Sequence, residues 1–207
     1  MATVFFITHP DVLIDPAVPV PDWPLSPRGV ARMRAMLAQP WISGIVAVWT
    51  STERKAGDGA AILAAHLGVV PITRTDLGEN DRSATGYLPK PEFEAMADAF
   101  FAHPETSVRG WERAVDAQAR IVSAMRAVLA AAPPGDVAVV SHGGVGALLL
   151  SHLQGAPINR TADQPEGSGG HVLAFDREDW TLRHGWRVAD ENLSRRAGEV
   201  EAPLRRA

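Results

Sequence analysis

Short runs of apolar, β-branched and aromatic residues are separated by longer segments with helical periodicity along most of the chain. Such short runs, bounded by turn residues, are typical of buried strands. The expected strands are Thr3–Thr8, Ile45–Trp49, Val69–Ile72, Val137–Ser141, His171–Asp176 and Thr181–Val188. The four earlier runs consist mainly of apolar and β-branched residues, and this favours strands that are covered on both faces.

Apolar positions three and four residues apart predict helices between these strands. Ser26 as N-cap with Pro27 at the first helical position opens the first helix, and Gly68 ends the second. The helices are expected from Ser26 to near Pro40, from Thr52 to Gly68, and over Glu92–Phe101, Trp111–Ala131 and Val145–Leu153. This alternation predicts an α/β fold, a three-layer sandwich whose mostly parallel central sheet has helices on both faces.

The domain organisation follows from the same pattern. Residues 1–190 are expected to form a single domain, and residues 191–207 a charged, loosely ordered C-terminal tail. The polar segment Thr73–Pro91 is expected to be a long functional loop that sets substrate specificity together with the Glu92–Glu112 region.

Composition and charge exclude several classes of function. The 207 residues contain no cysteine, so disulfide frameworks, zinc–thiolate sites and thiol nucleophiles are ruled out. Lys and Arg total 20 against 24 Asp and Glu, a formal net charge of −4, which does not favour binding to nucleic acid.

The first residues lack a basic signal-peptide region, and no apolar stretch approaches the length of a membrane span. We therefore expect a cytoplasmic protein with neither nucleic-acid nor membrane partners; a homodimer is compatible with the sequence.

Candidate chemistry lies directly after the predicted strands. His9 follows the first strand, Arg54 the second, Glu79 the third and His142 the fourth. In an open α/β sheet the carboxyl ends of parallel strands meet at one edge, where ligands bind. One imidazole can attack phosphorus, while arginine and the second imidazole stabilise the phosphoryl oxygens and a carboxyl group protonates the leaving oxygen. This set of residues therefore favours phosphoryl transfer.

The order of these motifs resembles the histidine phosphatase superfamily, which includes phosphoglycerate mutases and many small phosphatases. The matching segments are His9, Thr50-Ser51-Thr52-Glu53-Arg54, Leu77-Gly78-Glu79 and Ser141-His142-Gly143-Gly144. The resemblance implies a phosphoglycerate mutase-like fold, with His9 as the phosphorylated nucleophile, Glu79 as proton donor and acceptor, and Arg54 and His142 on the phosphoryl oxygens. It further implies a small phosphorylated substrate, and neither a cofactor nor a metal ion. Ser51 and the backbone at Gly143 complete the expected phosphate-binding set.

The first strand departs from the family pattern. The family has Arg-His-Gly at this point, whereas this chain has Thr8-His9-Pro10. Loss of one oxyanion donor costs about 2.7–4 kcal/mol, or about 10²–10³ in rate. Thr8 can supply one neutral hydroxyl bond to phosphate, and Arg82, Arg109 and Lys55 are the candidate replacement cations. Pro10 also lacks the amide that a glycine would offer.

Alternatives remain open from the sequence. Glu112 and Asp11 rival Glu79 as the proton donor. A second hypothesis is a phosphate-binding or regulatory protein that has lost turnover, and a third is a phosphoglycerate mutase-type phosphotransferase. A metal hydrolase with ligands from His9, Asp11, Asp15 and His142 lacks the ligand spacing that would support it. His171 could reach the pocket, but it is interpreted as the first residue of a strand.

Overall fold

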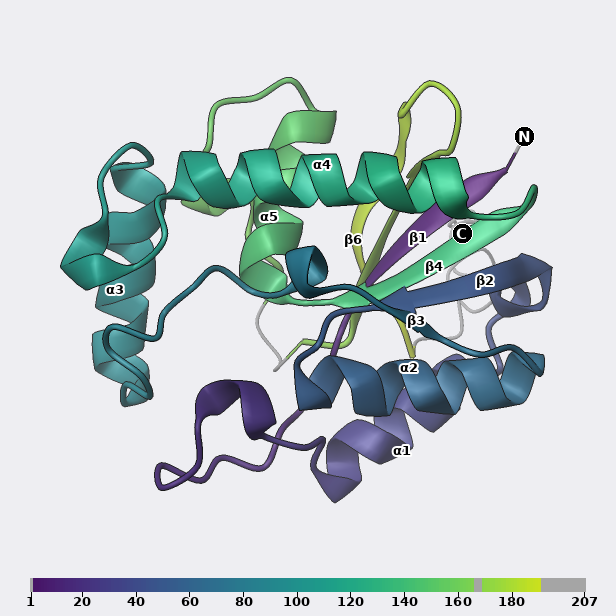
Figure 1. Cartoon of the computed structure of the whole chain (residues 1–207), viewed down its shortest axis with the longest axis horizontal. Helices are drawn as coiled ribbons and strands as arrows, with labels where there is room; N and C mark the ends of the chain where they lie inside the picture. The colour runs from purple at the N-terminus through teal and green to yellow at the C-terminus, as the bar shows by residue number, and fades with distance from the viewer. Residues whose placement is uncertain (1, 166–168, 191–207) are drawn as a thin grey trace, which may run out of the picture.

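The computed structural model describes residues 2–165 and 169–190, and the expected tail at 191–207 lies outside the described residues. Its centre is a six-stranded sheet in the order β3-β2-β4-β1-β5-β6 (Figure 1). The strands are β1 (Thr3–Thr8), β2 (Ile45–Thr50), β3 (Ile72–Thr73), β4 (Asp136–Ser141), β5 (His171–Asp176) and β6 (Leu182–Val188). The first four are mutually parallel, β5 pairs antiparallel with β1, and β6 pairs antiparallel with β5 and so runs in the same direction as the first four. The predicted mostly parallel α/β sheet is confirmed.

Helices cover both faces of the sheet, as the sequence predicts. They are α1 (Pro27–Met36), α2 (Arg54–Leu67), α3 (Lys90–Ala102), α4 (Ala114–Ala131) and α5 (Gly143–Leu153). Helices α1 and α2 lie on one face and α4 and α5 on the other, and α3 lies apart from the strands at the left of the view (Figure 1). None of the helices in the described part of the chain is long and apolar enough to cross a membrane.

Strand β1 contributes side chains to the hydrophobic cores on both faces of the sheet. Alternate side chains point to opposite faces of a strand. Val4 and Phe6 accordingly pack in the core beneath α4 and α5, whereas Phe5 and Ile7 pack in the core beneath α1 and α2. Because all six residues of β1 are buried, the strand is an apolar run without alternation.

The bounds of several predicted elements differ from the structure. Helix α1 ends at Met36, before Pro40, where a short 3-10 helix begins. The strand expected at Val69–Ile72 was wrong in its bounds: β3 contains Ile72 and Thr73, which pair with Trp49 and Thr50, and Val70 is 83% exposed. The amide of Val69 instead bonds to the end of α2, which keeps the chain off the sheet. Helix α4 begins at Ala114, three residues later than predicted, since a left-handed backbone at Arg109 and Gly110 turns the chain and buries Trp111 in the core.

The return of the chain into β5 is tightly packed against the end of β1. Gly169 has a φ of +72°, and a Cβ there would lie 2.1 Å from the His9 carbonyl oxygen. The amide of Gly170 donates to the Thr8 carbonyl at 3.2 Å. Glycine is therefore required at 169 both by backbone conformation and by the close approach of the segment that carries His9.

We predict that Gly169→Ala lowers the free energy of unfolding by at least about 2 kcal/mol, because a left-handed backbone and a backbone clash are combined at one residue. Urea denaturation measures the change. Gly57→Ala in α2 is the matched control, since a Cβ at that position would meet no neighbouring segment within 4 Å; it is expected to raise stability by roughly 0.5–1 kcal/mol. Equal effects of the two substitutions would contradict the prediction.

Candidate active site

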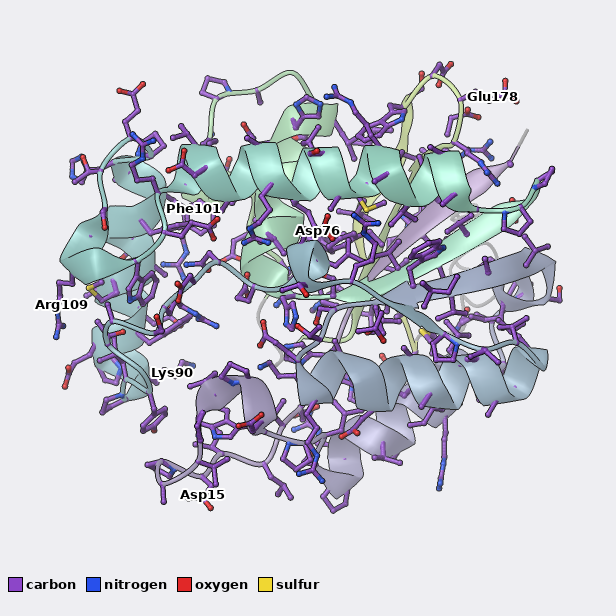
Figure 2. The ribbon with its side chains drawn as sticks, in the orientation of Figure 1. Asp15, Asp76, Lys90, Phe101, Arg109 and Glu178 are labelled. Carbon is purple, nitrogen blue, oxygen red and sulfur yellow. The ribbon has the colours of Figure 1, made fainter. Side chains whose placement is uncertain are left out.

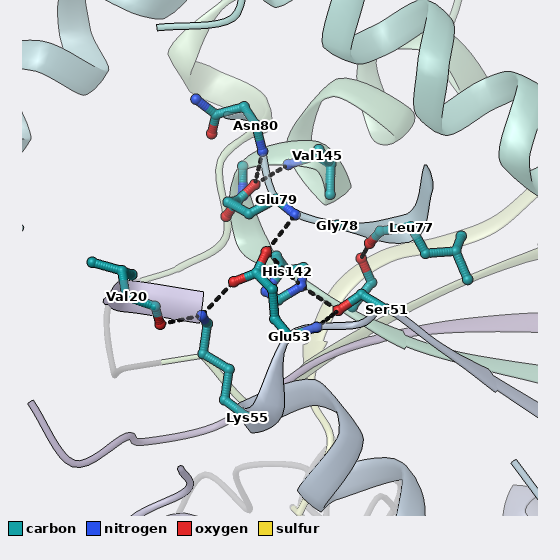
Figure 3. Close-up of polar contacts among 12 residues, drawn as sticks. Val20, Ser51, Glu53, Lys55, Leu77, Gly78, Glu79, Asn80, His142 and Val145 are labelled. Atoms are coloured by element: carbon teal, nitrogen blue, oxygen red, sulfur yellow. Dashed lines mark hydrogen bonds and ion pairs between the residues drawn. The ribbon is translucent and has the colours of Figure 1, made fainter. Parts of the chain in front are cut away.

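The ends of β1, β2 and β4 place two histidines side by side. His9 follows β1 and His142 follows β4, and these strands are neighbours in the sheet. The centroids of the two imidazole rings are 5.2 Å apart, with an angle of 69° between their planes. The polar groups around His142 come from β2, the start of α2, the segment that precedes α3 and the start of α5 (Figure 3).

His9 is arranged as a neutral nucleophile. Its Nδ1 lies 3.0 Å from the Pro10 carbonyl oxygen, which can only accept a hydrogen bond. Nδ1 therefore carries the proton, and the lone pair is on Nε2. Burial, and next the neighbouring His142, lower the pKa of His9 to about 3, so the ring is neutral at physiological pH.

His142 is held by groups from the end of β2. Its Nε2 is 2.7 Å from the Ser51 hydroxyl oxygen and 3.3 Å from Oε1 of Glu53. Since a carboxylate only accepts, Nε2 carries the proton, and the buried Nδ1 has no hydrogen-bond partner among the described residues. Burial lowers the pKa of His142, although the carboxylates of Glu53 and Glu79 oppose this effect. Ser51 is thus part of the site because its hydroxyl group is hydrogen-bonded to His142.

Glu53 and Lys55 form a buried ion pair at the start of α2. The ammonium group of Lys55 also donates to the Val20 carbonyl at 2.9 Å, and Oε1 of Glu53 accepts from the Glu79 amide at 2.8 Å (Figure 3). Burial acts to raise the pKa of Glu53, but His142 and Lys55 outweigh it and lower the value to about 2. The site therefore contains a second carboxylate that the sequence did not predict.

The cation next to His142 is Lys55, whereas Arg54 is exposed. Lys55 is 3% exposed. A helical signal could have found it, because Lys55, Gly59 and Leu63 are spaced four residues apart and share the buried face of α2. Arg54 lies one position away, on the solvent side. No comparable pattern marks Glu53, which lies at the N-cap before the helix.

The other predicted cations lie in different surroundings. The guanidinium of Arg82 lies over the rings of Phe93 and Trp111, 5.1 Å and 5.6 Å from their centroids, and its charge acts on Glu79 and His142. Arg109 is exposed and lies beside α3 at the periphery of the molecule (Figure 2). The structure therefore brings Arg82 to the site and leaves Arg109 outside it.

Thr8 and Gly143 are both packed against Gln164. The hydroxyl of Thr8 donates to Oε1 of Gln164 at 2.8 Å and accepts from the His171 amide at 3.0 Å, and Thr8 is fully buried. A Cβ at Gly143 would lie 2.3 Å from Nε2 of Gln164. The Thr8 hydroxyl therefore joins the end of β1 to Gln164 and to the start of β5. His171 is the first residue of β5, as interpreted from the sequence.

Glu79 reaches the site from the segment after β3. Its carboxylate accepts backbone N–H bonds from Asn80 at 3.1 Å, Gly144 at 3.1 Å and Val145 at 2.9 Å. The last two amides belong to the first turn of α5, where the helix dipole also favours a negative charge. Burial acts to raise the pKa of Glu79, but Arg82, His142 and these amides together hold it below its usual value.

Two residues fix the turn that carries Glu79. Arg120 of α4 donates to the carbonyl oxygens of Asp76, Gly78 and Glu79, at 3.0, 2.9 and 3.1 Å. The Ser141 hydroxyl donates to the Leu77 carbonyl at 2.7 Å. Both are positioning contacts that the sequence did not predict, because they join segments far apart in the chain.

The rival acids and the proposed metal ligands do not assemble. Glu112 is paired with Arg120 at 2.7 Å, and Asp11 is paired with Arg32 at 3.2 Å. Asp15 lies in the loop before α1, away from the strand ends (Figure 2). Within residues 2–165 and 169–190, no group of three or more His, Cys, Asp or Glu side chains is arranged to hold a metal ion. The suggested set of His9, Asp11, Asp15 and His142 is therefore not a cluster in the fold.

Comparisons with known proteins identify the family of the chain. The sequence profile of the histidine phosphatase superfamily (branch 1) matches residues 17–186, a range that begins after Thr8-His9-Pro10. None of the curated proteins matches the sequence.

Solved structures share the fold at low sequence identity. YhfR of Bacillus stearothermophilus superimposes with a TM-score of 0.75 and 20% identity, over 92% of this chain and 100% of that one. A mycobacterial glucosyl-3-phosphoglycerate phosphatase in complex with inorganic phosphate gives 0.72 and 21%, over 93% and 100%. A putative alpha-ribazole-5'-P phosphatase from Escherichia coli gives 0.63 and 18%, over 91% and 97%. The profile match, together with this shared fold, shows that the chain belongs to branch 1 of the histidine phosphatase superfamily.

Proposed function

We propose that the protein is a metal-independent phosphatase that hydrolyses a small phosphorylated substrate through a phosphohistidine on His9. The observation that carries the proposal is the state of His9. Its ring is neutral, Nδ1 donates its proton to the Pro10 carbonyl oxygen, and the lone pair of Nε2 is free. A second buried histidine, His142, lies beside it. The family and the phosphatases among its structural neighbours support this reaction class.

In the first step Nε2 of His9 attacks phosphorus, the bond from phosphorus to the leaving oxygen breaks, and its electron pair stays on the leaving oxygen, which then takes up a proton. His142 binds a phosphoryl oxygen through Nδ1. A substrate that carries one proton on its phosphoryl group shares that proton with Nδ1, and Glu53 is the counter-ion of the imidazolium that forms. In the second step water attacks the phosphohistidine, the phosphorus–nitrogen bond breaks, and its electron pair returns to Nε2. The Glu79 carboxylate accepts the proton of that water.

Positive charge in this pocket comes from Lys55 and Arg82. Lys55 lies close enough to His9 for its charge to lower the pKa of that ring. A lysine gives phosphate a point charge, in contrast to the planar fork of an arginine. We therefore expect Lys55 to take the role that the sequence assigned to Arg54.

We predict that His9 becomes phosphorylated. Rapid mixing with 4-nitrophenyl phosphate, followed by quenching in base, should trap an alkali-stable phosphoryl group, and peptide mass spectrometry should locate it on His9. His9→Ala should remove both the label and the hydrolysis in excess chelator, while His103→Ala, which changes an exposed histidine after α3, should keep both. Label on another residue, or activity abolished by the chelator, would refute the proposal.

We predict that His9 stays neutral down to about pH 4. A histidine with a lowered pKa binds its proton only at more acidic pH, so the nucleophile remains deprotonated as pH falls from 8 to 5. The ring signals of His9, followed by NMR and assigned with His9→Ala, should not shift over that range. In urea the same signals should titrate near the ordinary histidine pKa of 6.5. A midpoint near 6.5 in the folded protein would disprove this state of the ring.

We predict that Lys55→Met lowers kcat/KM for 4-nitrophenyl phosphate by about 10²–10³, the usual effect of removing one donor to a developing oxyanion. The inhibition constant of orthophosphate should rise as well. Arg54→Met, at the adjacent exposed position, should change both by less than about twofold. A larger loss of kcat/KM in Arg54→Met than in Lys55→Met would contradict this prediction and assign phosphate binding to Arg54.

A phosphate-binding protein with little turnover is the second candidate. Two contacts favour it: Lys55 is ion-paired with Glu53, and the Thr8 hydroxyl donates to Gln164. Fewer hydrogen-bond donors are therefore free to bind a phosphoryl group. This candidate predicts measurable affinity for orthophosphate in calorimetry and no phosphohistidine.

A further inference from the structure

A glutamine from the segment between α5 and β5 lies against the ends of both strands that carry the histidines. Gln164 contacts Thr8, the residue before His9, and Gly143, the residue after His142. Its Oε1 is 2.8 Å from the Thr8 hydroxyl oxygen, and a Cβ at Gly143 would lie 2.3 Å from its Nε2. The amide group of this side chain therefore borders the place where the two histidines meet.

The Thr8 hydroxyl fixes the direction in which that amide group points. This buried hydroxyl accepts a hydrogen bond from the His171 amide at 3.0 Å, so its own hydrogen needs an acceptor. Oε1 of Gln164 lies at 2.8 Å, whereas the His171 carbonyl oxygen lies at 3.4 Å. Because the shorter contact is the stronger bond, Oε1 accepts the hydrogen, and the NH2 group of Gln164 is on the side of Gly143.

The NH2 group of Gln164 has no acceptor within residues 2–165 and 169–190. The hydrogen bonds of Gln164 in this part of the chain use its Oε1 and its backbone N–H. Among the same residues, the buried Nδ1 of His142 also lacks a partner. A half-buried amide with two unused hydrogens is a donor that an anionic oxygen satisfies well.

The backbone that carries Gln164 is held by a chain of contacts, so the amide is in position before a ligand binds. The Gln164 N–H donates to Oδ1 of Asp163 at 2.8 Å, and Oδ2 of Asp163 accepts from Nε of Arg160 at 3.1 Å. Arg160 is in turn ion-paired with Glu94 and Asp98 of α3. A donor fixed in this way stabilises developing charge without reorganisation during the reaction.

We infer that Nε2 of Gln164 donates a hydrogen bond to a non-bridging oxygen of the phosphoryl group as this group passes from the substrate to His9. The inference rests on the proposed phosphohistidine route. A phosphoryl group that contacts Nε2 of His9 and Nδ1 of His142 lies between the strand ends that Gln164 borders. The sequence predicted a phosphate-binding hydroxyl at Thr8. In the fold that hydroxyl orients the amide, so Gln164 is the catalytic residue and Thr8 a positioning residue.

Two variants at position 164 separate a phosphate donor from a side chain that only joins segments. Gln164→Glu keeps the size of the side chain and the acceptor for Thr8, but at pH 8 it replaces the NH2 group by an anionic oxygen. Gln164→Met removes both donor and acceptor. We expect both to lower kcat/KM for 4-nitrophenyl phosphate by about 10²–10³, the usual effect of removing one donor to a developing oxyanion. Gln164→Glu should be the slower of the two, because its charge repels the phosphoryl group.

The inhibition constant of orthovanadate is the second readout, since vanadium can take up a fifth ligand as phosphorus does during transfer. It should rise in both variants at position 164. Gln118→Met is the matched control, because Nε2 of Gln118 donates to the Leu148 carbonyl at 2.9 Å and joins α4 to α5. This control should unfold at a lower temperature and keep the kcat/KM and the vanadate inhibition constant of the original protein.

The first set of outcomes decides the role of Gln164. Weaker vanadate inhibition and slower hydrolysis in Gln164→Glu, with the fold retained in circular dichroism, support the inference. Unchanged values in Gln164→Glu, with a loss only in Gln164→Met, overturn it, because the side chain then acts only through its bond to Thr8. If Gln164→Glu does not fold, Gln164→Met is compared with Gln118→Met: equal vanadate inhibition overturns the inference, and weaker inhibition in Gln164→Met alone supports it.

Phosphorylation of His9 decides the proposed function separately. Label on His9 together with normal vanadate inhibition in Gln164→Glu keeps the phosphatase and overturns the role of Gln164. Absence of label on His9, with an orthophosphate affinity that still depends on Gln164 in calorimetry, overturns the phosphatase and supports Gln164 as the donor to phosphate.

Discussion

The parallel pairing of β4 with β1 on one side and β2 on the other is the constraint on which the site depends. Residues Val137–Val140 of β4 have no exposed surface, so the register of the strand is fixed by packing on both faces. The pairing continues past the strands: the His9 amide donates to the Ser141 carbonyl at 3.0 Å, and the Ser51 amide to the Val140 carbonyl at 3.4 Å. A slip of one residue would move His9 and Ser51 away from His142.

Burial of charge is the second organising feature. The charged side chains of Glu53, Lys55 and Glu79 lie in the site, and each is matched by specific partners. Unpaired buried charges are costly, whereas paired and hydrogen-bonded ones are tolerated. The partners that make these charges tolerable also fix their protonation states. The site therefore combines anionic carboxylates with a neutral His9.

The end of β1 is tied to the start of β5 by a side chain. The Thr8 hydroxyl donates to Gln164 and accepts from the His171 amide, so it is engaged in contacts within the fold. The cations whose charge acts on His142 are Lys55 and Arg82, which comes from the segment between β3 and α3. Lys55 is paired with Glu53, so a carboxylate lies beside this cation.

The sequence by itself determined the fold class, five of the six strands, the start of α1, the end of α2, and the positions of His9, Glu79 and His142 after their strands. These features depend on local periodicity, on capping residues and on the apolar runs of buried strands, all of which are encoded within a few neighbouring residues. Only the tertiary structure decided that Lys55 and not Arg54 faces the pocket, that Glu53 holds His142, and that Arg109 lies outside. The same holds for Glu79, whose amide donors at Gly144 and Val145 are more than sixty residues away. Such contacts arise when distant segments meet, so the sequence located the residues of the chemistry while the fold set their charge and orientation.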